Sequence, residues 1–195
     1  QQGYQVAMSG TQEMRFSVMV DDGLIHPADR CPTPNQDARP EQSDPELVIL
    51  HGISLPPGEF GGAHIEQFFA NRLDWDEHPY FAEIRGIEVS AHLLIRRDGR
   101  LLQFVPFNCR AWHAGESSFR GRINCNDFSI GIELEGCDDI DYADPQYECL
   151  IAVMQALRNA YPALSMAGHC DVSPGRKTDP GPAFDWLRLY DGLSA

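Results

Sequence analysis

The sequence of 195 residues contains a single lysine, Lys177, no long apolar run and no closely spaced pair of cysteines. Its apolar runs fall far short of the roughly 18 to 20 residues that a membrane-spanning helix needs, so we expect no membrane partner. The formal net charge of −14 and the pI near 4.7 argue against nucleic acid as the main partner, because phosphate contacts require a basic face.

The cysteine spacing also lacks the CxxC pairs of zinc ribbons and redox motifs. We expect reduced thiols, which are typical of a cytoplasmic protein, although secretion would favour disulfides instead. Residues 1–20 show no basic start followed by an apolar core, so we expect no secretory signal. The cysteines are Cys31, Cys109, Cys125, Cys137, Cys149 and Cys170.

The length of the chain fits one domain with its own hydrophobic core. Met14 begins a stretch that reads like a native start, so residues 1–13 need not belong to the native protein. We therefore expect an N-terminal extension over residues 1–26 and the functional domain over 27–195. Residues 27–46 are rich in proline and polar side chains, which predicts a surface segment that leads into the domain.

The hydrophobic pattern predicts an α/β fold. Asp98-Gly99 marks a hairpin turn between two apolar segments, so the sheet is expected to be mixed rather than purely parallel. Gly131, inside a predicted strand, indicates a place where another group approaches the backbone closely. Residues 54–62 contain too much proline and glycine for regular structure. We expect strands over 47–51, 89–95, 101–105 and 128–134, and helices over 63–73, 144–158 and 183–190.

Three side chains have the chemistry of a catalytic zinc site: His51 at a predicted strand end, His169 after a glycine, and Asp179 in a turn. Such sites usually use three protein ligands and leave a fourth position for water. The reaction also needs a carboxylate to move the proton and a cation to stabilise the oxyanion. Glu133 and Lys177 are residues of these two types.

The spacing alone does not establish this site. A histidine near a strand end is more often a hydrogen-bonded structural residue, and Asp-Pro-Gly is by default a turn. Glu133 and Glu135 alternate with apolar residues, so one of them could face solvent. The residues by themselves therefore indicate no more than a plausible metal hydrolase.

The chain resembles the type 2 N-acetylmuramoyl-L-alanine amidases over nearly its whole length, from about residue 31 to 190, and within them the AmpD-type branch of cell-wall recycling. The matching segments occur in order and leave little room for insertions. They are residues 48–51 (VILH), 53–62 (ISLPPGEFGG), 89–92 (VSAH), 95–99 (IRRDG), 110–115 (RAWHAG), 125–136 (CNDFSIGIELEG), 168–171 (GHCD) and 176–186 (RKTDPGPAFDW).

This resemblance implies a single α/β domain like the peptidoglycan-recognition proteins, with a central mixed sheet flanked by helices. It implies one Zn²⁺ per chain held by His51, His169 and Asp179, with Glu133 and Lys177 as catalytic residues. In the broader family the third ligand is usually cysteine, so aspartate at 179 favours the AmpD-type branch. The implied reaction cleaves the amide between the lactyl group of 1,6-anhydro-N-acetylmuramic acid and L-alanine in small muropeptides, in the cytoplasm, with no obligate protein partner.

Four further residues are candidates near this site. Trp112 and His113 lie in a loop that resembles a wall contacting sugar or peptide, although Trp112 could equally be a packing residue. Arg176 is suited to a substrate carboxylate, although a solvated arginine is nearly as plausible. His92 is expected in the middle of a strand, as a residue behind the metal ligands.

Three positions depart from the pattern that the resemblance implies. Gly52 stands where asparagine is expected, and Glu88 and Asn124 stand where arginine is expected. These departures concern the fit of the peptide rather than the metal chemistry. Two alternative functions remain: a periplasmic or secreted amidase that acts on intact cell wall, and a peptidoglycan-binding module with an inactive site.

Overall fold

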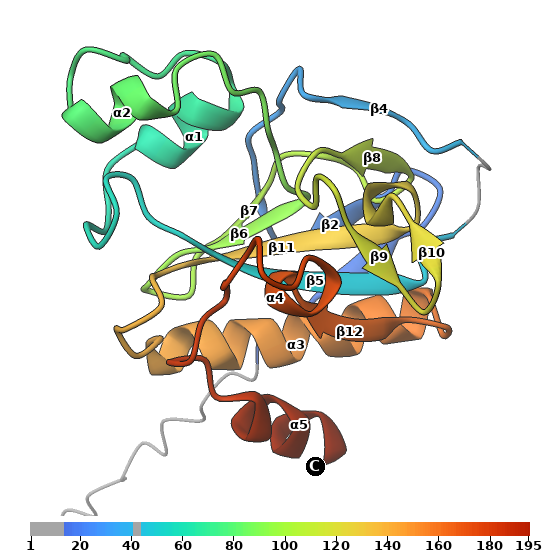
Figure 1. Cartoon of the computed structure of the whole chain (residues 1–195). Helices are drawn as coiled ribbons and strands as arrows, with labels where there is room; N and C mark the ends of the chain where they lie inside the picture. Colours follow the sequence, from blue (N-terminus) through green and yellow to red (C-terminus); the bar gives the residue numbers. More distant parts are fainter. Residues whose placement is uncertain (1–13, 41–43) are drawn as a thin grey trace, which may run out of the picture.

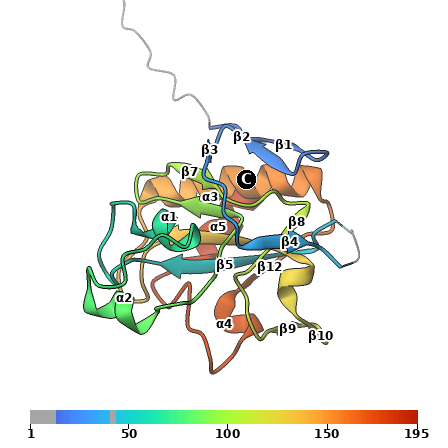
Figure 2. The same ribbon diagram turned by 90° about the horizontal axis from the view of Figure 1, so that it is seen from above.

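The computed structural model describes residues 14–40 and 44–195. Within these ranges the chain forms a central sheet of six strands with helices on either side of it (Figures 1 and 2). The four strands at one end of the sheet are parallel, whereas β7 is antiparallel to β6. This confirms the predicted α/β domain with a mixed sheet. From edge to edge the strands are β12 (Ser165–Gly168), β5 (Leu47–Ile53), β11 (Ser129–Glu135), β6 (Leu93–Ile95), β7 (Leu101–Gln103) and β3 (Asp29–Arg30).

The long helix α3 covers one face of the sheet, and α5 lies beyond it (Figure 1). The short helices α1 and α2 pack on the opposite face, against the side chains of β6 and β7 that point away from α3. The helices are α1 (His64–Phe69), α2 (Pro79–Glu83), α3 (Asp144–Ala160), α4 (His169–Val172) and α5 (Trp186–Ser194), with a 3-10 turn η1 (Cys125–Asp127).

The alternation of side chains along β5 and β11 determines which residues lie on the face opposite α3. Successive side chains of a strand point to opposite faces. Val48, Leu50 and Ile132 therefore enter the core beneath α3, while the intervening His51 and Glu133 face the other side of the sheet. On the opposite face Leu47 and Ile49 also pack in an apolar cluster, and His51 and Glu133 follow toward the carboxyl ends of the two strands.

The segment before β5 packs onto the domain more extensively than the sequence predicts. Two short ribbons, β1–β2 and β4–β8, supplement the sheet, and a third, β9–β10, lies near α4. Ile25, in the predicted extension, is fully buried in the core with α3, so residue 27 does not mark a break in the packing. Residues 1–13 lie outside the described part of the chain. The ribbon strands are β1 (Ser17–Met19), β2 (Leu24–His26), β4 (Gln36–Ala38), β8 (Cys109–Ala111), β9 (Ser118–Phe119) and β10 (Arg122–Ile123).

Residues 27–46 are also not merely a surface segment, so that prediction is wrong in part. Arg39 is only 3% exposed, and its guanidinium donates hydrogen bonds to the carbonyl oxygens of Phe107, Asn126, Asp127 and Ser129. Burial lowers the pKa of Arg39 to about 10. The segment therefore ties the loops around η1 to the start of β11.

Several predicted elements differ in their ends. Strand β5 continues two residues past His51, and the hairpin strands β6 and β7 are shorter than predicted. His92 precedes β6 rather than lying in the middle of a strand. Residues 54–62 contain no helix or strand, as predicted. No helix in the described ranges is long and apolar enough to cross a membrane.

Candidate metal centre

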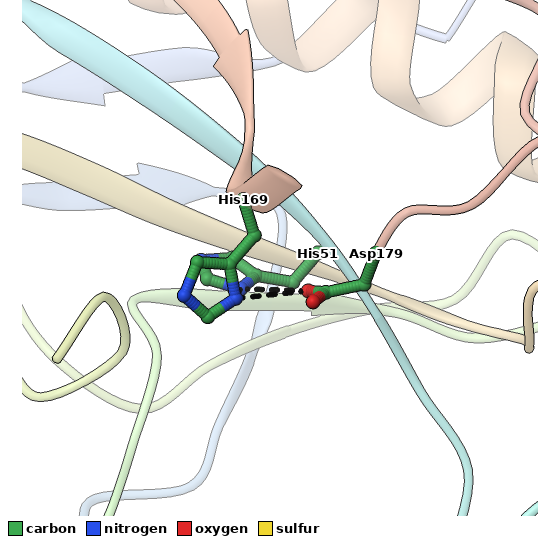
Figure 3. Close-up of side chains that lie close together, drawn as sticks. All are labelled: His51, His169 and Asp179. Atoms are coloured by element: carbon green, nitrogen blue, oxygen red, sulfur yellow. Dashed lines mark hydrogen bonds and ion pairs between the residues drawn. The ribbon is translucent and has the colours of Figure 1, made fainter. Parts of the chain in front are cut away.

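Three side chains from three different elements converge on one point (Figure 3). His51 projects from β5, His169 begins α4, and Asp179 lies in the loop after α4. The two Nδ1 atoms are 3.0 Å apart, and each lies 3.1 Å from Asp179 Oδ2. The Asp171 carboxylate accepts the backbone N–H of Gly168 at 2.7 Å, which fixes the turn from which His169 projects. The structure thus brings together residues that are up to 128 positions apart.

The second nitrogen of each imidazole indicates where the protons are. His169 Nε2 lies 3.1 Å from the carbonyl oxygen of Ala114, which can only accept, so this nitrogen carries the proton. The Nδ1 of neutral His169 therefore presents a lone pair to Asp179. His51 Nε2 lies 2.8 Å from His113 Nδ1, and His113 Nε2 lies 3.2 Å from Ser129 Oγ. When His51 donates to His113, its own Nδ1 is also a free lone pair.

Two lone pairs and a carboxylate oxygen at such distances repel one another unless a cation lies among them. In a tetrahedral site with metal–ligand bonds of about 2.0 to 2.1 Å, two ligand atoms are about 3.3 Å apart. The observed edges of 3.0 to 3.1 Å are close to that value. The three donors therefore fit a divalent metal ion, and together they form a cluster of possible metal ligands.

The protonation states of His51 and Asp179 suit the same purpose. Burial lowers the pKa of His51 to about 4 despite its contact with Asp179. Burial opposes ionisation of Asp179, but its contacts with the His169 and His51 side chains outweigh burial and lower the pKa of the carboxyl. Near neutral pH the site therefore holds neutral imidazole and ionised carboxylate, which are the forms that bind metal.

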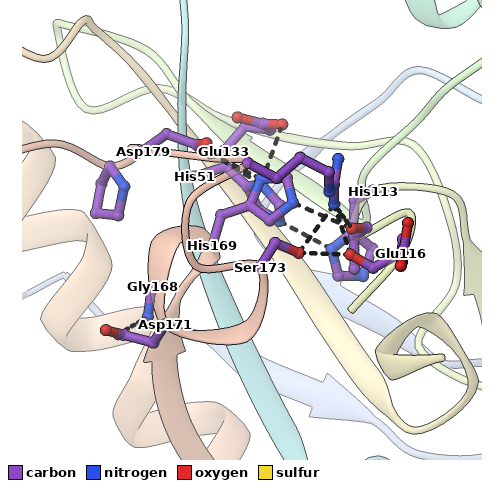
Figure 4. A network of polar contacts seen from close by, with 12 residues as sticks. His51, His113, Glu116, Glu133, Gly168, His169, Asp171, Ser173 and Asp179 are labelled. Carbon is purple, nitrogen blue, oxygen red and sulfur yellow. Dashed lines mark hydrogen bonds and ion pairs between the residues drawn. The ribbon is translucent and has the colours of Figure 1, made fainter. Parts of the chain in front are cut away.

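Glu133 lies beside this cluster with nothing to neutralise it. Its Oε1 is 3.9 Å from His51 Nδ1 (Figure 4), and its buried Oε2 has no hydrogen-bond partner in the described part of the chain. Burial and the nearby charge of Asp179 raise the pKa of Glu133 well above its usual range, and Lys177 offsets this in part. A carboxyl group with a raised pKa beside a metal site is suited to carry a proton during a reaction.

Glu135, two residues along the same strand, is also buried, so neither glutamate faces solvent. Glu135 is fully partnered. It accepts hydrogen bonds from Arg96, from the backbone N–H of Gly61 and from that of Arg97. It anchors the loop 54–62, whereas Glu133 is left free to react.

A cavity of about 610 Å³ opens over the metal cluster. Glu133, Lys177 and His113 line its polar side. Lys177 is exposed, and its ammonium group is close enough to lower the pKa of Glu133. Apolar lining comes from the loop 54–62, from α1 and α2 and from the segment after α2, with Leu55, Phe68, Tyr80, Ile84 and Ile87 among its residues.

The other candidate residues differ in whether they line the cavity. Arg176 lines the cavity and is held by hydrogen bonds from Nη2 to Ala114 O, Glu116 O and Ser173 Oγ. Trp112 is not among the lining residues. Its indole N–H has no hydrogen-bond partner in the described ranges, although its proximity lowers the pKa of Asp37 after the larger effect of Arg110.

His113 and His92 form a buried row of edge-to-face rings behind His51. The ring of His113 contacts that of His51 at 5.0 Å between centroids, and His92 follows at 5.9 Å. His92 accepts the backbone N–H of Gly131, and burial lowers its pKa to about 3. A Cβ on Gly131 would lie 2.5 Å from the ring of His113, so the close approach predicted at this glycine is confirmed.

Sequence reasoning missed Ser129 and Tyr142. Ser129 Oγ is the partner of His113, and Tyr142 donates its hydroxyl to Pro180 O next to Asp179. Neither residue type is diagnostic of a metal site. The one indication in the sequence was the pair of glycines, Gly52 and Gly136, whose missing side chains leave room for Tyr142.

Comparison with known proteins identifies similar sequences. The family model for N-acetylmuramoyl-L-alanine amidase (Amidase_2) matches residues 41–182. The 1,6-anhydro-N-acetylmuramyl-L-alanine amidase AmpD of Citrobacter freundii is 56% identical over 174 residues, which cover 88% of this chain and 93% of that protein. AmpD of Escherichia coli (strain K12) is also 56% identical over 174 residues, covering 88% and 95%.

A solved structure agrees with this match. The crystal structure of a selenomethionine derivative of AmpD superposes with a TM-score of 0.88 at 54% identity. The match covers 90% of this chain and 99% of that one. The similarity therefore extends over the sheet, the helices on both of its faces and the loops that carry the metal cluster.

Proposed function

The chain belongs to the N-acetylmuramoyl-L-alanine amidase family, and from this premise we propose that it is a zinc enzyme that acts on 1,6-anhydromuropeptides. The bond hydrolysed is the amide between the lactyl group of 1,6-anhydro-N-acetylmuramic acid and L-alanine, as in peptidoglycan recycling. The observation that supports it most directly is the triangle of two Nδ1 atoms and one carboxylate oxygen beside a buried carboxyl group without a partner.

In this proposal His51, His169 and Asp179 hold one Zn²⁺ per chain. When bound, zinc would acidify a water molecule and polarise the scissile carbonyl. Two nitrogens and one carboxylate oxygen are a common donor set for catalytic zinc. His113 and the carbonyl of Ala114 occupy the other nitrogens of the two imidazoles and so keep both Nδ1 atoms directed at the ion.

Glu133 is proposed as the proton carrier. Its carboxylate would take the proton of the attacking water and deliver it to the leaving amine of L-alanine. The unpartnered Oε2 is available for this transfer, and the low polarity that raises the pKa of Glu133 makes it a stronger base. The ammonium group of Lys177 lines the same cavity and would stabilise negative charge on the carbonyl oxygen.

The cavity suits a small substrate with one anionic and one apolar part. Arg176 and Lys177 contribute positive charge to its lining, and Tyr80, Ile84 and their neighbours contribute apolar surface. We propose that Arg176 contacts a carboxylate of the stem peptide. We propose that His113 supports His51 rather than contacting the substrate. We assign Trp112 to packing, because Trp112 does not line the cavity.

The amidase domain is proposed to comprise residues 27–195, with the β1–β2 ribbon packed onto it. A cytoplasmic location and action without an obligate protein partner are part of the same proposal. All six cysteines are free thiols in the structure, a usage typical of a reducing compartment.

The test is to measure the zinc content of the purified protein and the release of L-alanyl peptide from an anhydromuropeptide, with the Glu133→Ala variant as control. We expect one zinc per chain and turnover that the variant loses. A protein that binds one zinc but turns over no faster than Glu133→Ala would be a binding module instead. Faster release from intact sacculi than from anhydromuropeptides would reassign the chain to an amidase of the cell wall.

A further inference from the structure

Tyr142 lies where the strand of one proposed metal ligand meets the loop of another. It belongs to the segment between β11 and α3 and is only 5% exposed. Its hydroxyl donates a hydrogen bond of 2.8 Å to the carbonyl oxygen of Pro180, the residue after Asp179. The ring packs on Phe184 at 5.6 Å between centroids. The side chain is therefore held in one position.

Two glycines make room for this side chain. A Cβ built on Gly52, the residue after His51, would overlap the hydroxyl oxygen of Tyr142, and one on Gly136 would overlap its Cε1. The next nearest atoms to the Gly52 Cβ are Pro180 O and Tyr142 Cζ, both at an ordinary 3.6 Å. The hydroxyl oxygen alone thus excludes a side chain at position 52, where the resemblance implies asparagine.

Two of the hydrogen bonds that hold the loop of Asp179 lie next to its carboxylate, and they lead to different ligands. The backbone N–H of Cys170 donates to Asp179 O at 3.0 Å, which ties the loop to the element that begins with His169. Tyr142 supplies the second bond, at Pro180, against the strand that carries His51. The next such bond, from the backbone N–H of Ala183 to Asp138 O, lies four residues beyond Asp179. We therefore expect loss of the Tyr142 bond to affect the distance from His51 to Asp179 more than the distance from His169 to Asp179.

We propose that Tyr142 is a positioning residue for the metal. Its hydroxyl fills the space left by Gly52 and holds the Asp179 loop at the distance from His51 that a shared ion needs. Gly52 and Tyr142 therefore act as a pair in which the hydroxyl replaces a side chain after the first histidine. The inference rests on the proposed zinc site formed by His51, His169 and Asp179.

The experiment compares Tyr142→Phe, Gly52→Ala and the double variant by zinc dissociation constants from chelator competition and by unfolding of the metal-free proteins. Tyr142→Phe should weaken zinc binding about 10- to 100-fold, the usual effect of losing a group that orients a ligand. Gly52→Ala should weaken it at least as much, because the new methyl group displaces the hydroxyl. The double variant should bind zinc better than Gly52→Ala alone, since removing the hydroxyl removes the overlap.

The matched control is Tyr147→Phe. Tyr147 is 3% exposed and packs on the same Phe184. The substitution removes one hydrogen bond, which the Tyr147 hydroxyl accepts from the backbone N–H of Asp185. It should destabilise the metal-free protein about as much as Tyr142→Phe does but leave zinc affinity unchanged. Equal zinc affinity of wild type and Tyr142→Phe would overturn the proposal, as would a double variant that merely adds the two losses. If the wild-type protein bound no zinc, the metal site itself would be wrong, which is a separate result.

Discussion

His51 and Glu133 are register partners on adjacent parallel strands, so the backbone hydrogen bonds of the sheet set the distance between them. Their closest side-chain atoms, His51 Nδ1 and Glu133 Oε1, are 3.9 Å apart. Both strands are buried against α3 on their other face. A proposed metal ligand and a proposed base are thus carried by two interior strands of the sheet, and sites built on strands keep a precise geometry better than sites on loops.

The first prediction concerns turnover. Glu133→Gln should lower kcat by about 100- to 10,000-fold, the usual contribution of a positioned acid–base group. Zinc affinity should change by less than about threefold, because Glu133 is not a proposed ligand and glutamine has nearly the same size. The measurements are steady-state kinetics on an anhydromuropeptide and chelator competition. A variant that retains kcat would exclude Glu133 as the proton carrier.

The second prediction concerns stability without metal. The folded state keeps the proton of Glu133 above pH 4.5, whereas the unfolded chain releases it, so the wild type loses stability as pH rises from there. Glutamine carries no such charge. The free energy of unfolding of metal-free Glu133→Gln should therefore be about 1 to 3 kcal/mol higher than that of the wild type at pH 7 to 8. Denaturant unfolding measures it. The difference should vanish toward pH 4.5.

Glu135→Gln is the control for this prediction, because its carboxylate is buried in the same strand but is bonded to Arg96 and to two backbone N–H groups. Replacing this carboxylate should destabilise the protein at pH 7 to 8, since hydrogen bonds to a charged group are strong. Opposite signs for the two substitutions are the expected result. Equal signs would mean that Glu133 has a partner in solution.

The sequence predicts the parts of this molecule that follow from local pattern. The apolar run that ends in His51, the alternation around Gly131 and the helix that begins at Asp144 all have counterparts in the structure, with shifted ends. The three proposed ligands carried only a weak local signal, in their residue types and in their places at a strand end, after a glycine and in a turn. His51 and His169 are 118 residues apart, so the residues alone indicated no more than a metal hydrolase, and the resemblance was needed to make the zinc site specific.

What the sequence could not predict is decided by long-range packing. Nothing in its own neighbourhood shows that Arg39 is buried among carbonyl groups, or that Glu133 lacks the partners that Glu135 has. Trp112 lies next to His113 in the sequence, yet only His113 lines the cavity. Adjacent residues of an extended segment point to opposite sides, and which side faces the site depends on strands far away in the chain.

The third prediction is the pH dependence of the metal-free protein in mild acid. Burial lowers the pKa of His51 to about 4, that of His92 to about 3 and that of His113 well below 6.5. These histidines stay neutral in the folded state while the unfolded chain takes up protons below about pH 6.5, so stability is lost as pH falls from 6.5 toward 4.

The magnitude follows from the proton count. Near pH 5 the three histidines take up three protons when the chain unfolds, whereas Glu133, with its raised pKa in the folded state, releases one. The net uptake on unfolding is therefore about two protons. The free energy of unfolding should therefore fall by about 3 kcal/mol per pH unit near pH 5. A flat profile between pH 6.5 and 4.5 would contradict the neutral histidines.

The fourth prediction tests the support of His51 by His113. Gly131 lies in β11 with an ordinary strand backbone, so alanine is conformationally allowed there, but its Cβ would lie 2.5 Å from Cγ of His113. Gly131→Ala should therefore push the ring away from His51 Nε2, cost about 2 to 4 kcal/mol of stability and weaken zinc binding about tenfold or more. His113→Ala alone should weaken zinc binding similarly. Adding Gly131→Ala to His113→Ala should then cost no further stability, because the ring that it would meet is gone. An additional loss in the double variant, measured by denaturant unfolding, would show that Gly131 is required for a reason other than the approach of His113.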